Sequence, residues 1–331
     1  GMRDNGIDDE LGEQIWLKLA AFANYGFPES HSVSFSYLVY ASSWIKHHYP
    51  AAFCAALLNA QPMGFWSPHT LVGDARRHGV VVRTPDLNAS AASAILEGDS
   101  EAEVRLGLEY VRGIGTDLAE EISAGRPYAS VEDLRRRMPK LSLPILEALA
   151  TSGAFGCFGI DRRSALWTAG AMAQTSEDRL AGIVTGIDAP TLPGMSPEEL
   201  SHADLWATGV APDGHPTRYI REKLTGIGVI TATGLIDQPA GERVFVGGVV
   251  THRQRPATAG GTTFLNLEDE TGLINVVISK GCWQRYKGVA RGAPALLIRG
   301  RLEKEEGVIN VVADKLEPLP VGKAPASSDF R

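Results

Sequence analysis

The sequence has few cysteines, few aromatic residues and no long apolar run. Its three cysteines, Cys54, Cys157 and Cys282, lie far apart and outside any zinc-binding spacing. Scattered thiols fit a reducing cytoplasm better than a disulfide framework. No apolar stretch is long enough to span a bilayer, so we expect no membrane association. The opening Gly1-Met2 is unlike a signal peptide and has the form of a remnant left by tag removal.

Residue sets typical of catalysis are also missing. Asp8-Asp9-Glu10 and Asp269-Glu270 are runs of adjacent carboxylates, which do not face one metal ion without help from elsewhere. His47-His48 end a predicted helix, where they are better placed to cap carbonyl groups than to bind a metal. The sequence contains neither a Walker-type phosphate loop nor a zinc motif. We therefore expect no catalytic residue and no bound metal or cofactor in this chain.

The charge is acidic and unevenly distributed. The net charge is −7, whereas a free-standing nucleic-acid-binding protein is usually basic. Residues 241–320 hold 11 Lys and Arg against 9 Asp and Glu, but residues 1–240 hold 19 against 29. Any contact with nucleic acid must come from local patches, so binding should be weak and salt-sensitive.

The most informative stretch is Val104–Ser123, with Gly113-Ile114-Gly115 at its centre. Two glycines around one apolar residue give access to backbone angles closed to other residues, so Ile114 can turn inward in a tight hairpin. Thr116 or Asp117 can then cap the helix that follows. The free N–H groups at the start of that helix would face a phosphate oxygen, helped by the positive end of the helix dipole.

This pattern predicts a helix–hairpin–helix that binds a nucleic-acid backbone without reading bases. The residues expected to contact DNA are Arg112, Gly113, Ile114, Gly115 and Thr116. The alternative is an ordinary helical connection in which the glycines serve packing.

Three further segments are candidates for a similar phosphate contact. Thr151–Phe155 has a single glycine and forms a weaker, degenerate second hairpin, which would make the domain a tandem one. Gly226-Ile227-Gly228 repeats the pattern, but β-branched residues follow it, which favours a linker turn. Arg135-Arg136-Arg137 is either a solvated helix end or a phosphate contact.

From about residue 241 the apolar residues recur with a period of two, which indicates strands. The expected strands and the one helix among them are, in chain order, Arg243–Gln254, Thr262–Glu268, Leu273–Ile278, the helix Cys282–Val289, Ala295–Leu302 and Val308–Lys315. Three strands, a helix and two strands are the order of an OB barrel. Such barrels bind single strands by stacking bases on aromatic side chains in a basic groove.

The barrel offers a basic surface with few aromatic residues. The residues expected to contact a strand are Arg253, Arg255, Phe264, Arg299 and Arg301. Trp283 and Tyr286 lie on the inserted helix, and the acidic turn at residues 303–306 would repel phosphate. A barrel that serves as a spacer or a protein-docking module is an equal alternative.

The fold class expected from these patterns is multidomain, mainly α followed by all-β. The expected parts are residues 1–82 as helices, 83–170 as the tandem helix–hairpin–helix domain, 171–240 as a helical linker, 241–320 as the OB barrel and 321–331 as a disordered tail.

Five segments together resemble the C-family DNA polymerases of bacteria. In chain order they are Tyr25–His31, Pro85–Ser90, Leu106–Gly115, Ser152–Phe155 and Phe264–Gly272, which reads FLNLEDETG. Three details are similar to the error-prone, damage-inducible ImuC-type branch in its actinobacterial form, namely Pro28-Glu29, Ala41–Trp44 and Thr251–Ala259. The resemblance covers nearly the whole chain and matches the C-terminal portion of such a polymerase.

In that family the matching parts are the end of the fingers domain, the tandem helix–hairpin–helix domain and a C-terminal OB domain. The resemblance implies that the hairpin holds duplex DNA, that the OB domain lies near the single-stranded template, and that Ser30 and His31 approach the incoming nucleotide. It implies that the full protein is a DNA-directed DNA polymerase that copies past lesions at the nucleoid. The palm carboxylates that hold Mg²⁺ lie upstream in the family, so this chain alone should not polymerise.

The resemblance also has implications for protein partners. Replicative relatives carry a clamp-binding peptide between hairpin domain and barrel, but Ala171–Leu200 holds Gln174 with no aromatic residue at the needed spacing. The sliding clamp would then be reached only through an ImuB-like adaptor. Two roles stay open, DNA positioning and a scaffold that docks this adaptor. A tRNA-binding OB module, suggested by Phe264–Gly272 alone, fits the helical N-terminal half poorly.

Overall fold

The computed structural model describes residues 6, 8–23, 29–64, 66–98, 101–173, 189–321 and 328–330. The chain forms two compact units, residues 1–49 and residues 50–331. Within the described ranges, no helix combines the length and the apolar character needed to cross a membrane.

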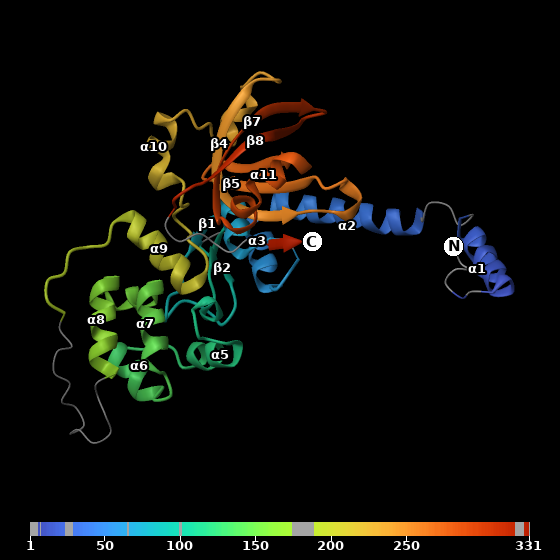
Figure 1. The fold of residues 1–331 in the computed structure, drawn as a ribbon. Helices are drawn as coiled ribbons and strands as arrows, with labels where there is room; N and C mark the ends of the chain where they lie inside the picture. The colour runs from blue at the N-terminus through green and yellow to red at the C-terminus, as the bar shows by residue number, and fades with distance from the viewer. Residues whose placement is uncertain are drawn as a thin grey trace. The chain divides into compact units, whose positions relative to one another are not determined.

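The first unit consists of helices α1 (Asp9–Ala23) and α2 (Glu29–His48) (Figure 1). Both helices fall within residues 1–82, which the sequence predicted as helical. Residues 24–28 lie outside the described part of the chain. None of the side chains of α2 is buried, and Tyr37 and Tyr40 are each 72% exposed.

The second unit opens with two helices and a small sheet. Its elements are α3 (Pro50–Asn59), α4 (Pro68–Arg77), β1 (Val81–Arg83), β2 (Ile95–Glu97) and β3 (Glu103–Arg105). Strand β3 is central, parallel to β1 and antiparallel to β2. Helix α4 begins at a side-chain cap, because the Ser67 hydroxyl accepts the Thr70 N–H at 3.2 Å and Pro68 occupies the first turn.

A helical domain follows, and one continuous core joins its members. The elements are the 3₁₀ turn η2 (Leu108–Tyr110), α5 (Thr116–Ala124), α6 (Val131–Arg137), α7 (Leu143–Ser152), the 3₁₀ turn η3 (Ala154–Phe158), α8 (Arg162–Ala173) and α9 (Pro197–Thr208). Helices α7 and α8 pack side by side, and α9 packs on α7 (Figure 1). A capping box begins α9, with the side chains of Ser196 and Glu199 each accepting the other's backbone N–H.

The segment predicted as a linker supplies side chains to more than one core. Trp206 of α9 packs against the helical domain, whereas Leu224 and Val229 are buried with barrel residues. Its later elements are the 3₁₀ turn η4 (Arg218–Ile220), α10 (Arg221–Gly226) and the 3₁₀ turn η5 (Thr233–Ile236). Ile227 is 56% exposed and no helix directly follows it, so Gly226–Gly228 is a linker turn, as predicted.

The C-terminal strands close into a five-stranded barrel, which confirms the predicted OB fold. Its elements are β4 (Arg243–Gln254), the 3₁₀ turn η6 (Ala257–Ala259), β5 (Thr263–Asp269), β6 (Gly272–Ile278), α11 (Lys280–Gly292), β7 (Ala295–Glu305) and β8 (Val308–Pro318). Around the barrel the strand order is β4-β5-β6-β8-β7, and β7 pairs back with β4. Each strand and the helix were predicted from the sequence to within a few residues.

Strand β4 is the strand that makes closure possible. Its first half pairs with β7 and its second half with β5, and the change of partner falls at Val249. A Cβ atom on Gly248 would lie 2.6 Å from the carbonyl oxygen of Glu268, so only glycine fits at this crossing.

The predicted disordered tail, residues 321–331, is only partly described. Ser328–Phe330 form β9, which pairs in parallel with His252–Gln254 of β4, so the prediction of disorder is wrong for these three residues. Residues 322–327 and 331 lie outside the described part of the chain.

Candidate nucleic-acid interface

The hairpin between η2 and α5 has the predicted tight bend around a buried Ile114. Gly113 has φ +82°, a conformation that favours glycine, and Ile114 is only 5% exposed. Gly115 differs from the prediction, because its φ of −88° and ψ of 172° are open to any residue. A Cβ atom on Gly115 would meet nothing within 4 Å. The fold therefore requires glycine at position 113 but not at position 115.

The cap of α5 also differs from the prediction. Neither Thr116 nor Asp117 caps the helix, because Thr116 is its first residue and Gly115 is the N-cap. Glycine has no side chain to accept the helix N–H groups, and no side-chain cap hydrogen bond is made. The start of α5 thus lacks the acceptor that Ser130 supplies at α6.

The hairpin consequently presents free backbone donors. Five amides find no hydrogen-bond acceptor in the described residues, those of Gly113, Gly115, Thr116, Asp117 and Leu118. Gly113, Gly115, Thr116 and Asp117 are exposed. Amides at the positive end of a helix dipole are suited to a phosphate oxygen.

The surroundings of the hairpin carry charges of both signs. A cavity of about 510 Å³ adjoins the bend and is lined by Gly115, Thr116 and Glu109 among others. The exposed Asp117 lies in the first turn of α5, where it favours the helix dipole but would repel a phosphate. The amides are therefore free of internal partners, but two carboxylates lie close to them.

Arg112 anchors the hairpin to α9. Its backbone N–H donates to the carbonyl of Ala207 at 2.7 Å, and its guanidinium lies over the Trp206 ring, 4.8 Å from the centroid. The side chain is exposed beside the free amides. Arg112, Gly113, Ile114, Gly115 and Thr116, all predicted to contact DNA, thus form one surface apart from the buried Ile114, which holds the bend.

The other candidate phosphate contacts in this domain serve the fold. Arg135 donates to the carbonyls of Pro139 and Leu141, and Arg136 pairs with Asp133 at 2.6 Å. Arg137 donates to carbonyls of Gly125 and Pro127 and lies over the Tyr128 ring. These contacts favour the helix-end interpretation of the triple arginine.

The degenerate second hairpin differs from the first in the element that follows the bend. Gly153 has φ +87° and Phe155 is fully buried, as an inward-turning residue should be. A 3₁₀ turn, η3, follows directly, so no α-helix N-terminus is presented at this bend.

In the barrel, Arg253, which was predicted to contact a strand, is held by hydrogen bonds within the fold. Only 7% of it is exposed, and its guanidinium donates to the carbonyls of Ala290 (2.9 Å) and Ala293 at the end of α11. These bonds satisfy helix carbonyls that lack an internal partner. They also fix α11 against β4.

The predicted surface formed by Arg299, Arg301 and Phe264 is not a single site. Arg299 pairs with Asp314 at 2.7 Å, and Arg301 pairs with Glu303. Phe264 is 39% exposed on β5, where it neighbours Val277 of β6. The two arginines are neutralised by carboxylates, and neither lies on a strand paired to β5.

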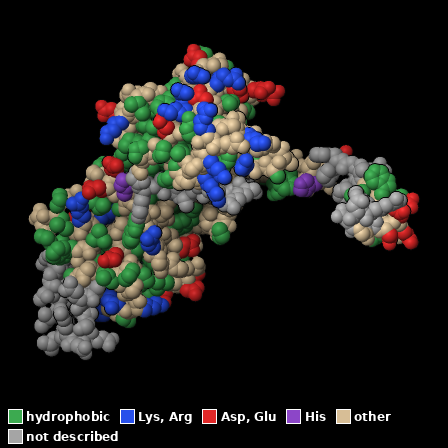
Figure 2. Space-filling model, in the orientation of Figure 1, with side chains coloured by type: hydrophobic (Ala, Val, Ile, Leu, Met, Phe, Trp, Pro, Cys, Tyr) green, Lys and Arg blue, Asp and Glu red, His purple; other side chains and the backbone are tan. Residues whose placement is uncertain are grey.

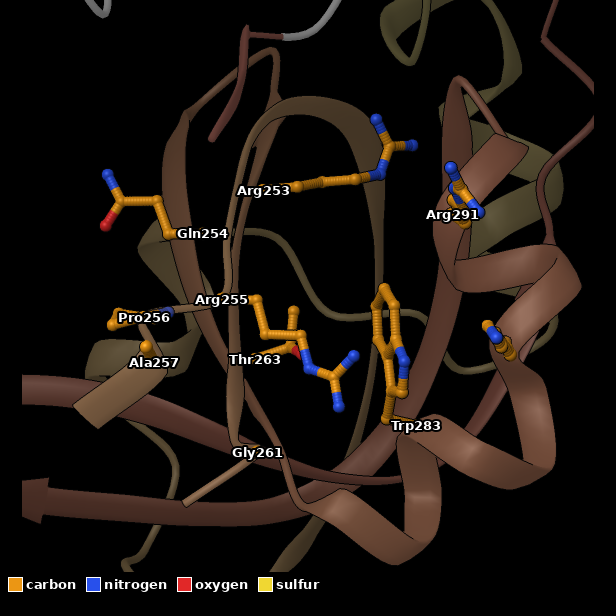
Figure 3. Close-up of a pocket in the computed structure, with 10 residues that line it drawn as sticks. Arg253, Gln254, Arg255, Pro256, Ala257, Gly261, Thr263, Trp283 and Arg291 are labelled. Atoms are coloured by element: carbon orange, nitrogen blue, oxygen red, sulfur yellow. The ribbon is translucent and has the colours of Figure 1, made fainter. Parts of the chain in front are cut away.

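A different basic pocket, of about 610 Å³, lies between α11 and the loop that joins β4 to β5 (Figure 3). Its cationic lining residues are Arg253, Arg255, Lys287 and Arg291, and none of the described residues that line it is a carboxylate. Arg255 points toward Trp283, with its guanidinium carbon 5.3 Å from the ring centroid (Figure 3). Figure 2 shows Lys and Arg side chains, in blue, over the visible face of the barrel.

Sequence reasoning found only part of this pocket. Arg255 and Trp283 were noted separately, but Lys287 and Arg291 were missed. Their spacing of four on one helix, one turn beyond Trp283, was the signal that could have revealed them.

Ser30 and His31 lie in the first turn of α2, in the first unit. Both are exposed, the Ser30 carbonyl accepts the Ser34 hydroxyl at 2.9 Å, and the His31 ring lies 4.5 Å from that of Phe35. Gln174 lies outside the described residues. Within the described ranges, no group of His, Cys, Asp and Glu is arranged to hold a metal ion.

Two family models match the chain. A helix-hairpin-helix motif matches residues 79–165, and an OB-fold nucleic acid binding domain matches residues 244–319. Among solved structures, asparaginyl-tRNA synthetase from Pyrococcus horikoshii aligns with 30% of this chain and 24% of its own chain at 21% identity. The TM-score of this alignment is 0.25.

Several relatives match over the whole chain. Proteins named error-prone DNA polymerase from Mycolicibacterium paratuberculosis and Mycobacterium tuberculosis are each 54% identical over 100% of it. The relative of the same name from Nocardia farcinica is 55% identical over 99%. The chain spans 31%, 30% and 29% of the length of these three relatives.

The fold and the family models define a protein with a helix–hairpin–helix domain followed by a nucleic-acid-binding OB domain. The relatives identify it further, because the chain is a homologue, over its whole length, of the actinobacterial error-prone DNA polymerases. The resemblance seen in its sequence is thereby confirmed.

Proposed function

We propose that this chain is the DNA-positioning segment of an error-prone DNA polymerase. The observation that carries the proposal is the set of free amides at Gly113–Leu118, which forms a phosphate-sized donor surface at a helix start. Gly115 supports it, because nothing inside the protein requires glycine there. A missing side chain at an exposed, unstrained position leaves room for a DNA backbone to approach closely.

The barrel would take the single-stranded template beyond the duplex, and the longer protein would carry out lesion-tolerant DNA synthesis. Nucleotidyl transfer would need carboxylate-bound Mg²⁺, which we assign to a palm domain outside this chain. Ser30 and His31 would then face the incoming nucleotide only when the rest of the fingers is present. Primer extension with Mg²⁺ by the chain alone would contradict this division of labour.

The substitution Gly115→Ser tests the hairpin. Serine is a preferred N-cap residue, so its hydroxyl should accept an α5 amide and stabilise the fold by about 0.3 kcal/mol relative to glycine. The same hydroxyl removes one free donor and occupies the approach to the others. We expect an unchanged or raised melting temperature and weaker binding to a labelled DNA duplex in fluorescence anisotropy.

The matched variant is Asp117→Asn, two residues away on the same turn. It removes a negative charge beside the amides, so duplex binding should become tighter rather than weaker. Equal duplex affinity for wild type and both variants would show that the hairpin serves packing alone.

A second role, docking of an ImuB-like adaptor, is favoured by the surface of α2. Val33, Tyr37 and Tyr40 are 68–72% exposed on a helix with no buried side chain, and exposed apolar surface of this kind marks contact sites. The clamp would then be bound through the adaptor. Direct capture of this chain by the clamp without adaptor would contradict the indirect route.

A further inference from the structure

The pocket between α11 and the β4–β5 loop holds three cations without an anionic partner in the described part of the chain. Arg255, Lys287 and Arg291 are exposed, and none makes a hydrogen bond or ion pair with the described residues. No carboxylate lines the pocket among the residues that the structure describes, although the whole chain has a net charge of −7. Three unpaired cations held together in an acidic chain indicate an anionic ligand.

The end of the barrel at the β7–β8 turn is less suited to a polyanion. OB folds commonly bind strands over their second and third strands and over the loops that join the first to the second and the fourth to the fifth, here β5, β6, the β4–β5 loop and the β7–β8 turn. That turn carries Glu305 and Glu306, with Glu303 beside it. Arg299 and Arg301 on β7 are already paired with carboxylates. A phosphate backbone on this route would meet acids and neutralised arginines.

The pocket also holds a flat ring that a base could reach once Arg255 moves. Trp283 is only 8% exposed, and the Arg255 guanidinium carbon lies 5.3 Å from its ring centroid (Figure 3). A base stacked between them needs two intervals of about 3.4 Å, the rise per base of a stacked strand, so Arg255 must swing outward by roughly 1.5 Å. Arg255 is exposed and has no hydrogen bond to hold it within the described chain, so this movement is open to it.

One buried polar atom points to the same ligand. The Thr263 hydroxyl lines the pocket, the residue is 1% exposed, and the oxygen has no hydrogen-bond partner in the described chain. A buried hydroxyl without a partner is unfavourable, and a polar edge of a base is one group that could satisfy it. The pocket is also preorganised, because Arg253 of β4 donates to a carbonyl of α11 and so fixes one wall against the other.

We propose that this pocket binds one unpaired nucleotide of a single strand, with its base on Trp283 and its flanking phosphates on Lys287 and Arg291. The inference rests on the proposed function and deepens it, because it places the template on the helix side of the barrel rather than over Phe264. Recognition by stacking and phosphate contact is tolerant of base identity, as copying of any template requires.

The test uses the full chain and a fluorescein-labelled oligo(dT) in anisotropy titrations. The double variant Lys287→Ala/Arg291→Ala should bind about tenfold more weakly, and the slope of log affinity against log salt should become shallower by about 1.4. Arg299→Ala/Arg301→Ala is the matched control, because it removes two cations of β7 that do not line the pocket, and it should change little. Phe264→Ala should likewise leave binding unchanged.

A second probe separates base from phosphate. An abasic oligomer of equal length should bind more weakly than oligo(dT) to wild type, because it cannot stack on Trp283. Equal affinity for the two probes would overturn the base-stacking part, and loss of binding in Arg299→Ala/Arg301→Ala alone would overturn the location. If Gly115→Ser weakens duplex binding while Lys287→Ala/Arg291→Ala binds oligo(dT) normally, the hairpin function stands and this inference fails.

Discussion

Two glycines in one hairpin have different physical roles, although the sequence presents them as a symmetric pair. Gly113 is required by its positive φ, and Gly115 is not required by any contact inside the chain. The sequence could predict the bend, because an apolar residue between glycines turns inward. It could not predict which residue would cap α5, because Gly115, Thr116 and Asp117 are all acceptable near a helix start and only the φ and ψ angles decide among them.

A pair of histidines makes the stability of this chain sensitive to acid. The rings of His69 and His215 stack 5.8 Å apart, and burial lowers their pKa to about 4 and about 3. The unfolded chain takes up protons near pH 6.5, but the folded chain does not until much lower pH. The stability from these neutral rings is therefore complete above pH 6.5 and is lost as pH falls toward 4, at about 1.4 kcal/mol per unit and per histidine.

Asp204 acts in the opposite direction over part of this range. Burial raises its pKa to about 6, so the folded chain binds that proton first as pH falls. The test therefore compares His215→Gln with wild type. Both proteins contain Asp204, so its contribution to the pH dependence cancels. Between about pH 7 and about pH 5, the urea midpoint of wild type should fall further than that of His215→Gln. Parallel losses would show that His215 is not kept neutral by the fold.

At the scale of elements, strand β4 determines whether the barrel closes. A Cβ atom on Gly248 would meet backbone, 2.6 Å from the Glu268 oxygen, whereas one on Gly247 would meet only the end of the Leu297 side chain at 2.9 Å. Gly248→Ala should therefore lower the free energy of unfolding by about 3 kcal/mol, and Gly247→Ala by about 1 kcal/mol. Thermal melts of the two variants check this, and equal losses would contradict the assigned crossing.

The elements were predictable to different degrees for a physical reason. Alternating strands with an inserted helix follow a short-range pattern, so β4 was predicted with its observed bounds. The basic pocket joins Arg255 to Lys287 and Arg291 across a loop and a helix, and the separation of such residues in the sequence hides their proximity. The pairing of Arg299 with Asp314 was hidden in the same way, because it depends on the β7–β8 register.

At the scale of the molecule, the acidic balance limits how DNA can be bound. Few unpaired cations face the two proposed surfaces, so few counterions are released on binding. With two phosphate-contacting cations at the barrel pocket, Lys287 and Arg291, the slope of log affinity for oligo(dT) against log salt should be about −1.4. Titrations at several salt concentrations measure it. A slope much steeper than this would require a basic surface outside the two proposed sites.

The three consecutive carboxylates at the end of β5 and in its turn hold other segments of the chain. Glu268 accepts from Thr70 (3.0 Å) and Arg77 (3.2 Å) of α4. Asp269 and Glu270 both accept from Arg221, at 3.2 and 2.8 Å. The most recognisable part of the barrel sequence, FLNLEDETG, therefore also links the barrel to α4 and α10.

An excised barrel, residues 241–320, would lose every one of these cationic and hydroxyl partners while keeping all three acids side by side. Like charges left together in that way repel one another, and Glu268 and Asp269 are almost fully buried. A domain boundary at residue 241, as strand periodicity suggests, would separate these carboxylates from the residues that pair with them. The minimal self-sufficient piece that contains this barrel must reach back at least to α4.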